Sequence, residues 1–150
     1  MPADLNHLLT QLPHHPPMRL VEQIVDVVPG QSASTTRVAR DGDWYFDGHF
    51  PANPVVPAIA LVELLAQTGG LAIAPQSSEP IALRLASLND FKFPAAAGPG
   101  ALLQATAEVV GRLGPLIKIS GRVTADGTLV ASGSLTLAEV APLRSPEPHA

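Results

Sequence analysis

Residues 57–74 read PAIALVELLAQTGGLAIA, and this stretch decides the fold. Pro57 suits the first position of a helix, where its missing N–H has no partner to lose. The apolar residues that follow surround the helix axis on nearly every side: Ile59, Leu61, Val62, Leu64, Leu65, Leu71 and Ile73. A helix without a polar face is buried on most sides. We therefore predict one central helix over residues 57–74, with the rest of the chain packed around it.

The sequence before this helix predicts a short helix and a β-hairpin. The short helix covers residues 4–12 and ends before Pro13. Residues 19–28 are rich in β-branched side chains and predict a strand, closed by a turn at Pro29–Gly30. Residues 32–39 are the expected partner strand of the hairpin.

The sequence after the helix predicts four more strands. The first covers residues 81–88 and continues through 91–93. In the other three, apolar and polar residues alternate, which is typical of antiparallel strands with one buried face. The expected inward positions are Leu103, Ala105, Ala107, Val109, Ile117, Ile119, Val123, Leu129, Ala131, Leu135 and Leu137. Turns are expected at 98–100, 111–114 and 126–127. The whole pattern predicts an α+β domain, in which an antiparallel sheet wraps around one long central helix.

Length and composition fit a single domain. The 150 residues carry a net charge of −4, which disfavours a nucleic-acid partner because phosphate recognition needs a basic surface. Cysteine is absent, which excludes disulfides, cysteine nucleophiles and cysteine-ligated metal centres. Only 15% of the residues are charged, and this low fraction predicts a large subunit interface. We expect one domain over residues 1–150, with its core at about 12–138 and a disordered tail at 142–150.

Neither a secretory signal nor a membrane span is expected. Residues 1–12 lack a basic segment followed by an apolar run. The apolar stretch 50–78 is interrupted by four prolines, and its helical part is shorter than the ~20 residues that a bilayer requires. We expect a cytoplasmic protein with no membrane partner.

Glu63 is the only charged residue between positions 50 and 78. A carboxylate in an apolar helix is costly to bury unless it is paired or protonated. A raised pKa would let Glu63 act as an acid near neutral pH. The alternative is a glutamate at an exposed edge of the helix or in a structural ion pair, and the residue pattern leaves both interpretations open.

His49 lies between an aromatic loop and the start of the helix. The loop, residues 41–54, holds four aromatic side chains, which either line a pocket or cap the core: Trp44, Tyr45, Phe46 and Phe50. Prolines at 51, 54 and 57 stiffen the segment after His49. Such stiffness would hold a catalytic ring in one geometry, but it would serve plain stability equally well.

Together, His49 and Glu63 could be the base and the acid of a proton-transfer reaction. Motifs for a serine nucleophile, a phosphate-binding loop or a metal site are not found in the sequence. The serines have no G-x-S-x-G context, and the turn at 98–100 is followed by neither a helix nor a lysine, as a phosphate loop would be. His14 and His15 are adjacent, which is poor spacing for joint metal ligation. No metal site is expected.

The run HFPANPVVPA at 49–58, with Glu63 and Gln67 beyond it, resembles a known family. It is similar to the G-H-F-P-G-N-P-V-M-P-G pattern of the 3-hydroxyacyl-[acyl-carrier-protein] dehydratases of fatty-acid synthesis, which have the hot-dog fold. The acid fourteen residues after the histidine matches as well. Residues 12–22 are similar to the family's P-H-x-x-P-x-x-L-V-D opening, and 91–100 to its K-F-x-x-P-V-x-P-G-D segment. The resemblance covers about residues 12–138, and the His–Pro block is its most specific part.

This resemblance implies dehydration of a 3-hydroxyacyl thioester to the trans-2-enoyl thioester. It implies that His49 takes the C2 proton as a general base and that Glu63 protonates the departing C3 hydroxyl. The Ala58 N–H would bind the thioester oxygen, and the Val55 carbonyl would orient the His49 ring. No metal or redox cofactor is implied.

Two alanines depart from the family pattern. Ala52 and Ala58 stand where the family has glycine, and the Ala58 methyl narrows the pocket while its N–H is kept. These changes suggest a divergent member of a fatty-acid, polyketide or aryl-polyene type synthesis. Glutamate at position 63, in place of the aspartate of the dehydratase–isomerase branch, disfavours isomerase activity. Phe50 and Gln67 complete the expected substrate-binding residues.

The resemblance also implies partners. The acyl chain would arrive on an acyl-carrier protein or on CoA, and the chain would form a homodimer or a trimer of dimers. In the family, the histidine and the acid come from different protomers. Two other functions remain open from the residues: an acyl thioesterase on the same fold, in which Glu63 activates water, and a catalytically inactive acyl-binding subunit.

Overall fold

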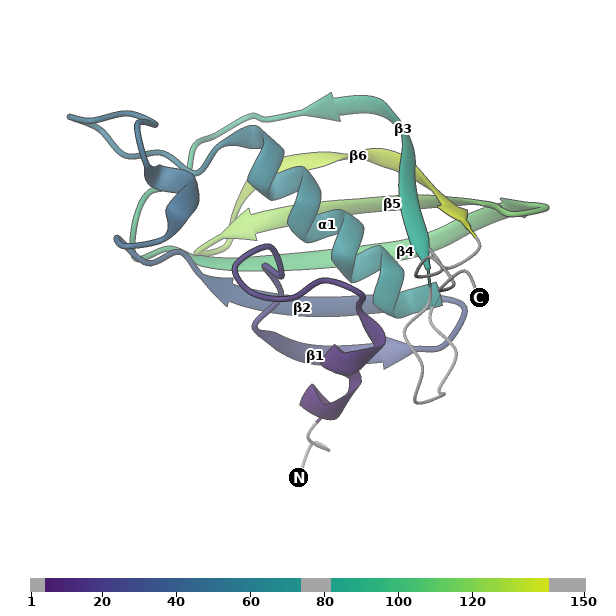
Figure 1. Cartoon of the computed structure of the whole chain (residues 1–150). Coiled ribbons are helices and arrows are strands. Elements are labelled where there is room, and N and C mark those ends of the chain that lie inside the picture. Colours follow the sequence, from purple (N-terminus) through teal and green to yellow (C-terminus); the bar gives the residue numbers. More distant parts are fainter. Residues whose placement is uncertain (1–4, 74–81, 141–150) are drawn as a thin grey trace, which may run out of the picture.

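The computed structural model describes residues 5–73 and 82–140. A six-stranded antiparallel sheet in the order β1-β2-β4-β5-β6-β3 wraps around the helix α1 (Ala58–Ile73), as Figure 1 shows. The strands are β1 (Gln23–Val28), β2 (Ser32–Val38), β3 (Leu83–Lys92), β4 (Leu102–Leu113), β5 (Leu116–Ala125) and β6 (Thr128–Glu139). Of two 3₁₀ helices, Asn6–Gln11 precedes β1 and Trp44–Phe46 lies between β2 and α1. The predicted α+β arrangement of a sheet around one helix is therefore confirmed.

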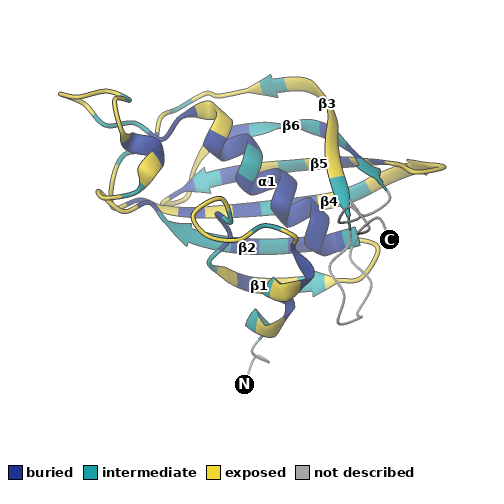
Figure 2. Ribbon diagram, in the orientation of Figure 1, coloured by how far each residue is buried: buried dark blue, intermediate teal, exposed yellow. Residues whose placement is uncertain are grey.

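The central helix is buried along most of its length, as predicted from its apolar sequence (Figure 2). Its packing on the sheet is close: a Cβ on Gly69 would lie 3.2 Å from Ile119 of β5. The prediction that Pro57 is the first helical residue is wrong. Pro57 precedes the helix, and its carbonyl accepts the N–H groups of Ala60 and Leu61. The exposed part of the helix is its beginning, where Ile59 is 75% exposed.

The first strand begins later than predicted. Residues 19–22 are not part of β1, although their apolar composition suits a strand. The reason is a competing partner: the backbone N–H groups of Leu20 and Val21 donate to Oε1 of Gln67 on the helix. The N-terminal segment is thereby attached to α1 before the chain enters the sheet.

Two details of the C-terminal strands also differ from the prediction. The turn expected at 111–114 lies at Gly114–Pro115, because β4 continues to Leu113 past a register shift between Val109 and Gly111. The predicted inward position Leu129 is exposed, and Val130 is fully buried in its place. A second register shift, between Val123 and Thr124 where β5 pairs with β6, moves the alternation by one residue. Predicted boundaries at Ala74 and Ile81, and the tail at 142–150, lie outside the described residues.

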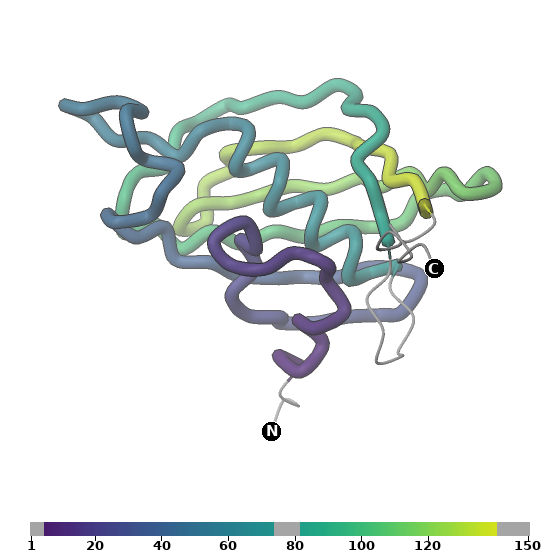
Figure 3. Tube along the Cα trace, in the orientation of Figure 1, coloured from purple at the N-terminus to yellow at the C-terminus, as the bar shows by residue number. Residues whose placement is uncertain are grey.

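The arrangement leaves two features for the site. The connection from β2 to α1 extends away from the sheet, and the N-terminal segment passes along the helix (Figure 3). Strand β3 pairs with β6 on one side only, and its other edge has no partner strand in residues 5–73 and 82–140. Among the described residues, no helix is both long enough and apolar enough to cross a bilayer.

Candidate active site

His49 is held by backbone groups of its own loop. Its N–H donates to the Phe46 carbonyl, and its carbonyl accepts the N–H of Val55, both at 2.9 Å. Its ring atom Nδ1 lies 3.0 Å from the Val55 carbonyl oxygen, so the predicted contact between these two residues is confirmed. The ring also stacks on Phe50, with the two centroids 4.3 Å apart. The side chain therefore has one well-defined orientation.

The contact with Val55 determines the tautomer of His49. A carbonyl oxygen can only accept, so Nδ1 must carry the hydrogen of this bond. In the neutral ring the other nitrogen, Nε2, is then unprotonated and carries a free lone pair. The geometry supplies the nitrogen that a general base requires.

The start of α1 lies beside His49. His49, Pro57, Ala58 and Ile59 line one cavity of about 480 Å³, together with part of the aromatic loop. The first N–H groups of a helix have no partner within the helix, and the helix dipole makes this end positive. Ala58 is the first residue of α1, so its N–H is placed to bind a developing negative charge.

Glu63 is contacted by two side chains through the same oxygen. Its Oε1 accepts a hydrogen bond from Gln67 Nε2 at 2.9 Å and lies 3.3 Å from Nε2 of His14. The pKa of Glu63 is lowered, chiefly by the hydrogen bond from His14, which outweighs the raising effect of burial. Of the two interpretations that the sequence left open, the contacts fit the paired carboxylate and not the raised pKa, and the physical reason is a partner from a distant part of the sequence.

Gln67 connects the helix to the N-terminal segment. It is 1% exposed, its Oε1 accepts from Leu20 and Val21, and its Nε2 donates to the Met18 carbonyl as well as to Glu63. Its hydrogen-bonding groups are thus engaged with the protein itself. The assignment of Gln67 to substrate binding stays a prediction, and the contacts show how it holds Glu63 in place.

Glu63 also borders an apolar cavity of about 470 Å³. The cavity is lined by α1, β3, the N-terminal segment and Trp44, and Glu63 is the one ionisable side chain among its lining residues. The apolar side chains contributed by β3 and the residues after it are Leu85, Leu88, Phe91 and Phe93. Such a space suits a hydrocarbon chain whose reactive end lies near a carboxyl group.

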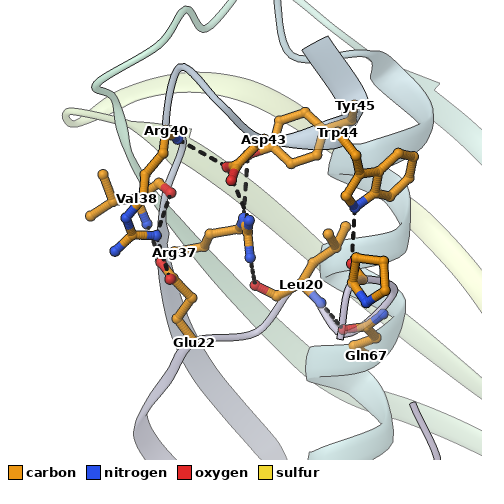
Figure 4. A network of polar contacts seen from close by, with 10 residues as sticks. Leu20, Glu22, Arg37, Val38, Arg40, Asp43, Trp44, Tyr45 and Gln67 are labelled. Carbon is orange, nitrogen blue, oxygen red and sulfur yellow. Dashed lines mark hydrogen bonds and ion pairs between the residues drawn. The ribbon is translucent and has the colours of Figure 1, made fainter. Parts of the chain in front are cut away.

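The aromatic loop is fixed by a polar network (Figure 4). Asp43 Oδ2 lies 3.0 Å from Arg37 Nη2 and accepts hydrogen bonds from the Tyr45 hydroxyl at 2.6 Å and the Arg40 N–H at 2.9 Å. Arg37 also donates to the Leu20 carbonyl. Burial, followed by the hydrogen bond to Asp43, raises the pKa of Tyr45 to about 12, so its hydroxyl remains a donor at neutral pH.

The two interpretations of the aromatic loop are each correct for different residues. Phe46 is buried and caps the core, and Tyr45 is buried as well but also lines the cavity of His49. Trp44 is 41% exposed and lines both the cavity of His49 and the cavity of Glu63. Its indole N–H donates to the Pro17 carbonyl at 2.9 Å, which connects this wall to the N-terminal segment. Phe50 is exposed and contacts the His49 ring.

His49 and Glu63 are not in contact within one chain: the structure records no hydrogen bond or ion pair between them, and they line different cavities. Ala58 and Ile59 line both cavities. In the described ranges 5–73 and 82–140, no group of three or more His, Cys, Asp or Glu side chains could hold a metal ion.

Sequence reasoning missed the partners of the two candidate residues. The adjacent pair His14 and His15 indicates no metal site, and nothing in its spacing predicts that His14 contacts Glu63. Arg37 and Asp43 were not singled out, although they fix the loop that carries His49. The P-H pair at positions 13–14 was a usable signal, because it belongs to a motif quoted for the family resemblance.

Comparison with known proteins identifies the class of this fold and site. The solved dehydratase heterocomplex ApeI:P from Xenorhabdus doucetiae has a TM-score of 0.74 at 18% identity, covering 89% of this chain and 91% of that chain. A hypothetical thioesterase with coenzyme A from Streptococcus pneumoniae TIGR4 has a TM-score of 0.61 at 13% identity, covering 79% and 84%. These neighbours establish the hot-dog fold.

The sequence comparisons are more specific. Residues 12–134 match the FabA-like domain. The chain is 35% identical over 133 residues to the 3-hydroxyacyl-[acyl-carrier-protein] dehydratase FabZ of Myxococcus xanthus, covering 87% of each protein. It is 34% identical over 136 residues to the FabZ of Streptococcus sanguinis, covering 90% of this chain and 96% of that protein. The chain belongs to the FabA-like family, among relatives named as dehydratases, which are hydro-lyases.

Proposed function

We propose that this protein removes water from a 3-hydroxyacyl thioester, carried by an acyl-carrier protein, to give the trans-2-enoyl thioester. The observation that carries the proposal is the geometry of His49. Its Nδ1–H is held by the Val55 carbonyl, which leaves Nε2 as a base in the cavity that also contains the start of α1. A proton acceptor beside a helix N-terminus suits removal of a proton next to a thioester carbonyl.

The reaction needs one base and one acid. His49 Nε2 takes the proton from C2, and the negative charge that develops on the thioester oxygen is stabilised by the Ala58 N–H. Glu63 gives a proton to the C3 hydroxyl oxygen as the C3–O bond breaks, and water leaves. The electron pair of the C2–H bond becomes the new C2–C3 π bond. The apolar cavity beside Glu63 accepts the acyl chain.

We propose that the complete site forms between two copies of the chain. Within one copy, His49 and Glu63 line different cavities. Strand β3 has one unpaired edge, and its exposed apolar side chains include Leu85 and Leu88 at the cavity of Glu63. A ten-residue edge strand with exposed leucines favours pairing with another strand. Antiparallel pairing of two β3 strands would make a symmetric dimer, in which His49 of one copy meets Glu63 of the other.

The substrates fit the context of fatty-acid, polyketide or aryl-polyene type synthesis, and the expected location is the cytoplasm. Incubation with 3-hydroxybutyryl and longer thioesters, followed by mass spectrometry, tests the reaction. Enoyl thioester supports the proposal. Free thiol would instead establish a thioesterase, and unchanged substrate would favour an inactive acyl-binding subunit.

A mixing experiment tests the shared site directly. His49→Ala and Glu63→Gln are each expected to be inactive alone. If the chains are unfolded together and refolded in equal amounts, half of the dimers are mixed, and each mixed dimer holds one site with both native residues. Activity should therefore return to about a quarter of the wild-type value. A site formed within one chain would show no recovery, since every chain carries a defect.

A further inference from the structure

Glu63 binds both of its side-chain partners through one carboxylate oxygen. Oε1 accepts from Gln67 Nε2 at 2.9 Å and is 3.3 Å from His14 Nε2. Neither of these contacts involves Oε2. When such a carboxyl group takes up a proton, the proton is placed on the other oxygen, because the first oxygen is already occupied as an acceptor.

Glu63 borders two cavities, and its two side-chain partners line only one of them. His14 and Gln67 line a small cavity of about 60 Å³, together with Glu63. Glu63 also lines the large apolar cavity, to which neither His14 nor Gln67 contributes. Oε1 is thus engaged by two residues of the small cavity, whereas Oε2 takes part in neither of these contacts.

We infer that His14 is a positioning residue for Glu63: with Gln67 it occupies Oε1, so that the proton given to the leaving hydroxyl is carried on Oε2. The inference rests on the proposed dehydratase function. After donation, Glu63 is a carboxylate whose charge is stabilised by the hydrogen bond from His14 Nε2. Glu63 regains a proton from solvent once water and product have left, and His49 returns the C2 proton to solvent, so protons balance over one turnover.

The surroundings leave His14 as the one ionisable partner of this carboxyl group. The residues that line the two cavities bordered by Glu63 come from the N-terminal segment, α1, β3, β6 and the aromatic loop. Among those of them that fall in the described part of the chain, His14 and Glu63 are the only titratable side chains. Nδ1 of His14 is buried and has no hydrogen-bond partner among the described residues, so the contact with Glu63 is the one hydrogen bond of this ring that the described residues provide.

The contact has a predictable effect on pH dependence. The hydrogen bond from His14 is the largest influence on Glu63 and lowers the pKa of its carboxyl group. Removal of His14 should therefore raise the pKa of Glu63. Because the acid must be protonated to act, activity should persist to higher pH in the variant, even though its maximum rate is lower.

The test compares three variants with the wild type: His14→Ala, His14→Gln, which keeps an N–H donor, and His15→Ala. His15 is the matched control, since it is the adjacent histidine and is exposed. Steady-state kcat and KM are measured against pH with a 3-hydroxyacyl thioester. The pKa of Glu63 is measured separately by NMR on protein with ¹³C-labelled glutamate carboxyls.

We expect His14→Ala to lose roughly tenfold or more in kcat, with a smaller change in KM, because a misplaced acid slows the chemical step. The alkaline limb of kcat and the carboxyl pKa should both move to higher pH. His14→Gln should recover most of kcat, and His15→Ala should match the wild type. The inference would be overturned if His14→Ala kept both the alkaline limb of the kcat profile and the Glu63 carboxyl pKa of the wild type, whatever its thermal stability. A wild-type protein that forms no enoyl product would instead refute the dehydratase function, while the NMR titration would still test the contact.

Discussion

His49 and Glu63 are held in different ways, and the difference explains what each can do. His49 is fixed by backbone groups between Phe46 and Val55, all within one short loop. Glu63 is fixed by side chains, one of which, His14, comes from a distant segment. A backbone-held ring has a single tautomer and orientation. A carboxyl group held by other side chains, here an amide and an imidazole, has a proton affinity that its partners can change.

The largest loss of activity is expected from removing the imidazole ring of His49, the residue held by backbone groups. His49→Ala should reduce dehydration by roughly 10²–10⁴-fold, the usual contribution of a general base. Thermal stability should change little, because the ring is only partly buried and lies in a loop. Turnover and thermal midpoint are measured on the same preparation, with His15→Ala as the control. Retention of more than about a tenth of the activity would make His49 a structural residue.

A smaller loss of activity is expected from replacing Glu63, the residue held by other side chains. Glu63→Gln keeps the size of the side chain and an oxygen that can accept from Gln67 and His14, but it removes the transferable proton. Activity should fall by about 10²-fold or more. Glu108→Gln, an exposed carboxylate on β4, is the matched control. An active Glu63→Gln variant would contradict the proposed mechanism.

The same variant also tests the lowered pKa of Glu63 through stability. A carboxyl group with a lowered pKa in the folded state stabilises the protein above its ordinary pKa, and this contribution is lost as the pH falls through the folded-state pKa. The thermal midpoint of the wild type should therefore exceed that of Glu63→Gln at neutral pH. The difference should shrink below about pH 4.3, the usual pKa of glutamate. A constant difference at all pH values would show that the contact with His14 does not stabilise the fold.

The contrast between local and distant contacts also explains how far the sequence could be interpreted. The central helix and the alternating strands follow from periodicity, which is a local property of the chain. The His49–Val55 contact spans six residues and belongs to a motif that the resemblance identified. These features were predicted correctly.

Features that depend on distant partners could not be obtained in this way. The late start of β1 depends on Gln67, which binds the N–H groups of Leu20 and Val21 from 47 and 46 residues away. The direction of the Glu63 pKa depends on His14, which periodicity does not place beside the helix. The buried position of Val130 depends on a register shift between neighbouring strands. Each error comes from a tertiary contact that overrides a local pattern.

A smaller effect is expected when the loop that carries His49 is loosened. In Asp43→Asn the acceptor shared by Arg37, Tyr45 and Arg40 loses its charge, so the network that fixes the loop weakens. We expect kcat to fall by about tenfold through misplacement of the ring, with a stability loss of roughly 1–3 kcal/mol. Asp41→Asn, an exposed aspartate on the same loop, should have neither effect. Equal activity in the two variants would show that the backbone contacts alone position His49.

The smallest effect, a change in substrate selectivity, is expected at Ala58, which lines both cavities. Ala58 lines the cavity of His49 and the cavity of Glu63, and its methyl group occupies space that a glycine would leave open. Ala58→Gly should therefore raise kcat/KM for 2-methyl-branched 3-hydroxyacyl thioesters relative to unbranched ones. A methyl-sized contact contributes about 0.8 kcal/mol, which corresponds to roughly fourfold. Ala52→Gly is the matched control, since Ala52 is exposed and lines neither cavity. Competition between a branched and an unbranched substrate measures the ratio directly, and an unchanged ratio would mean that Ala58 does not limit the width of the site.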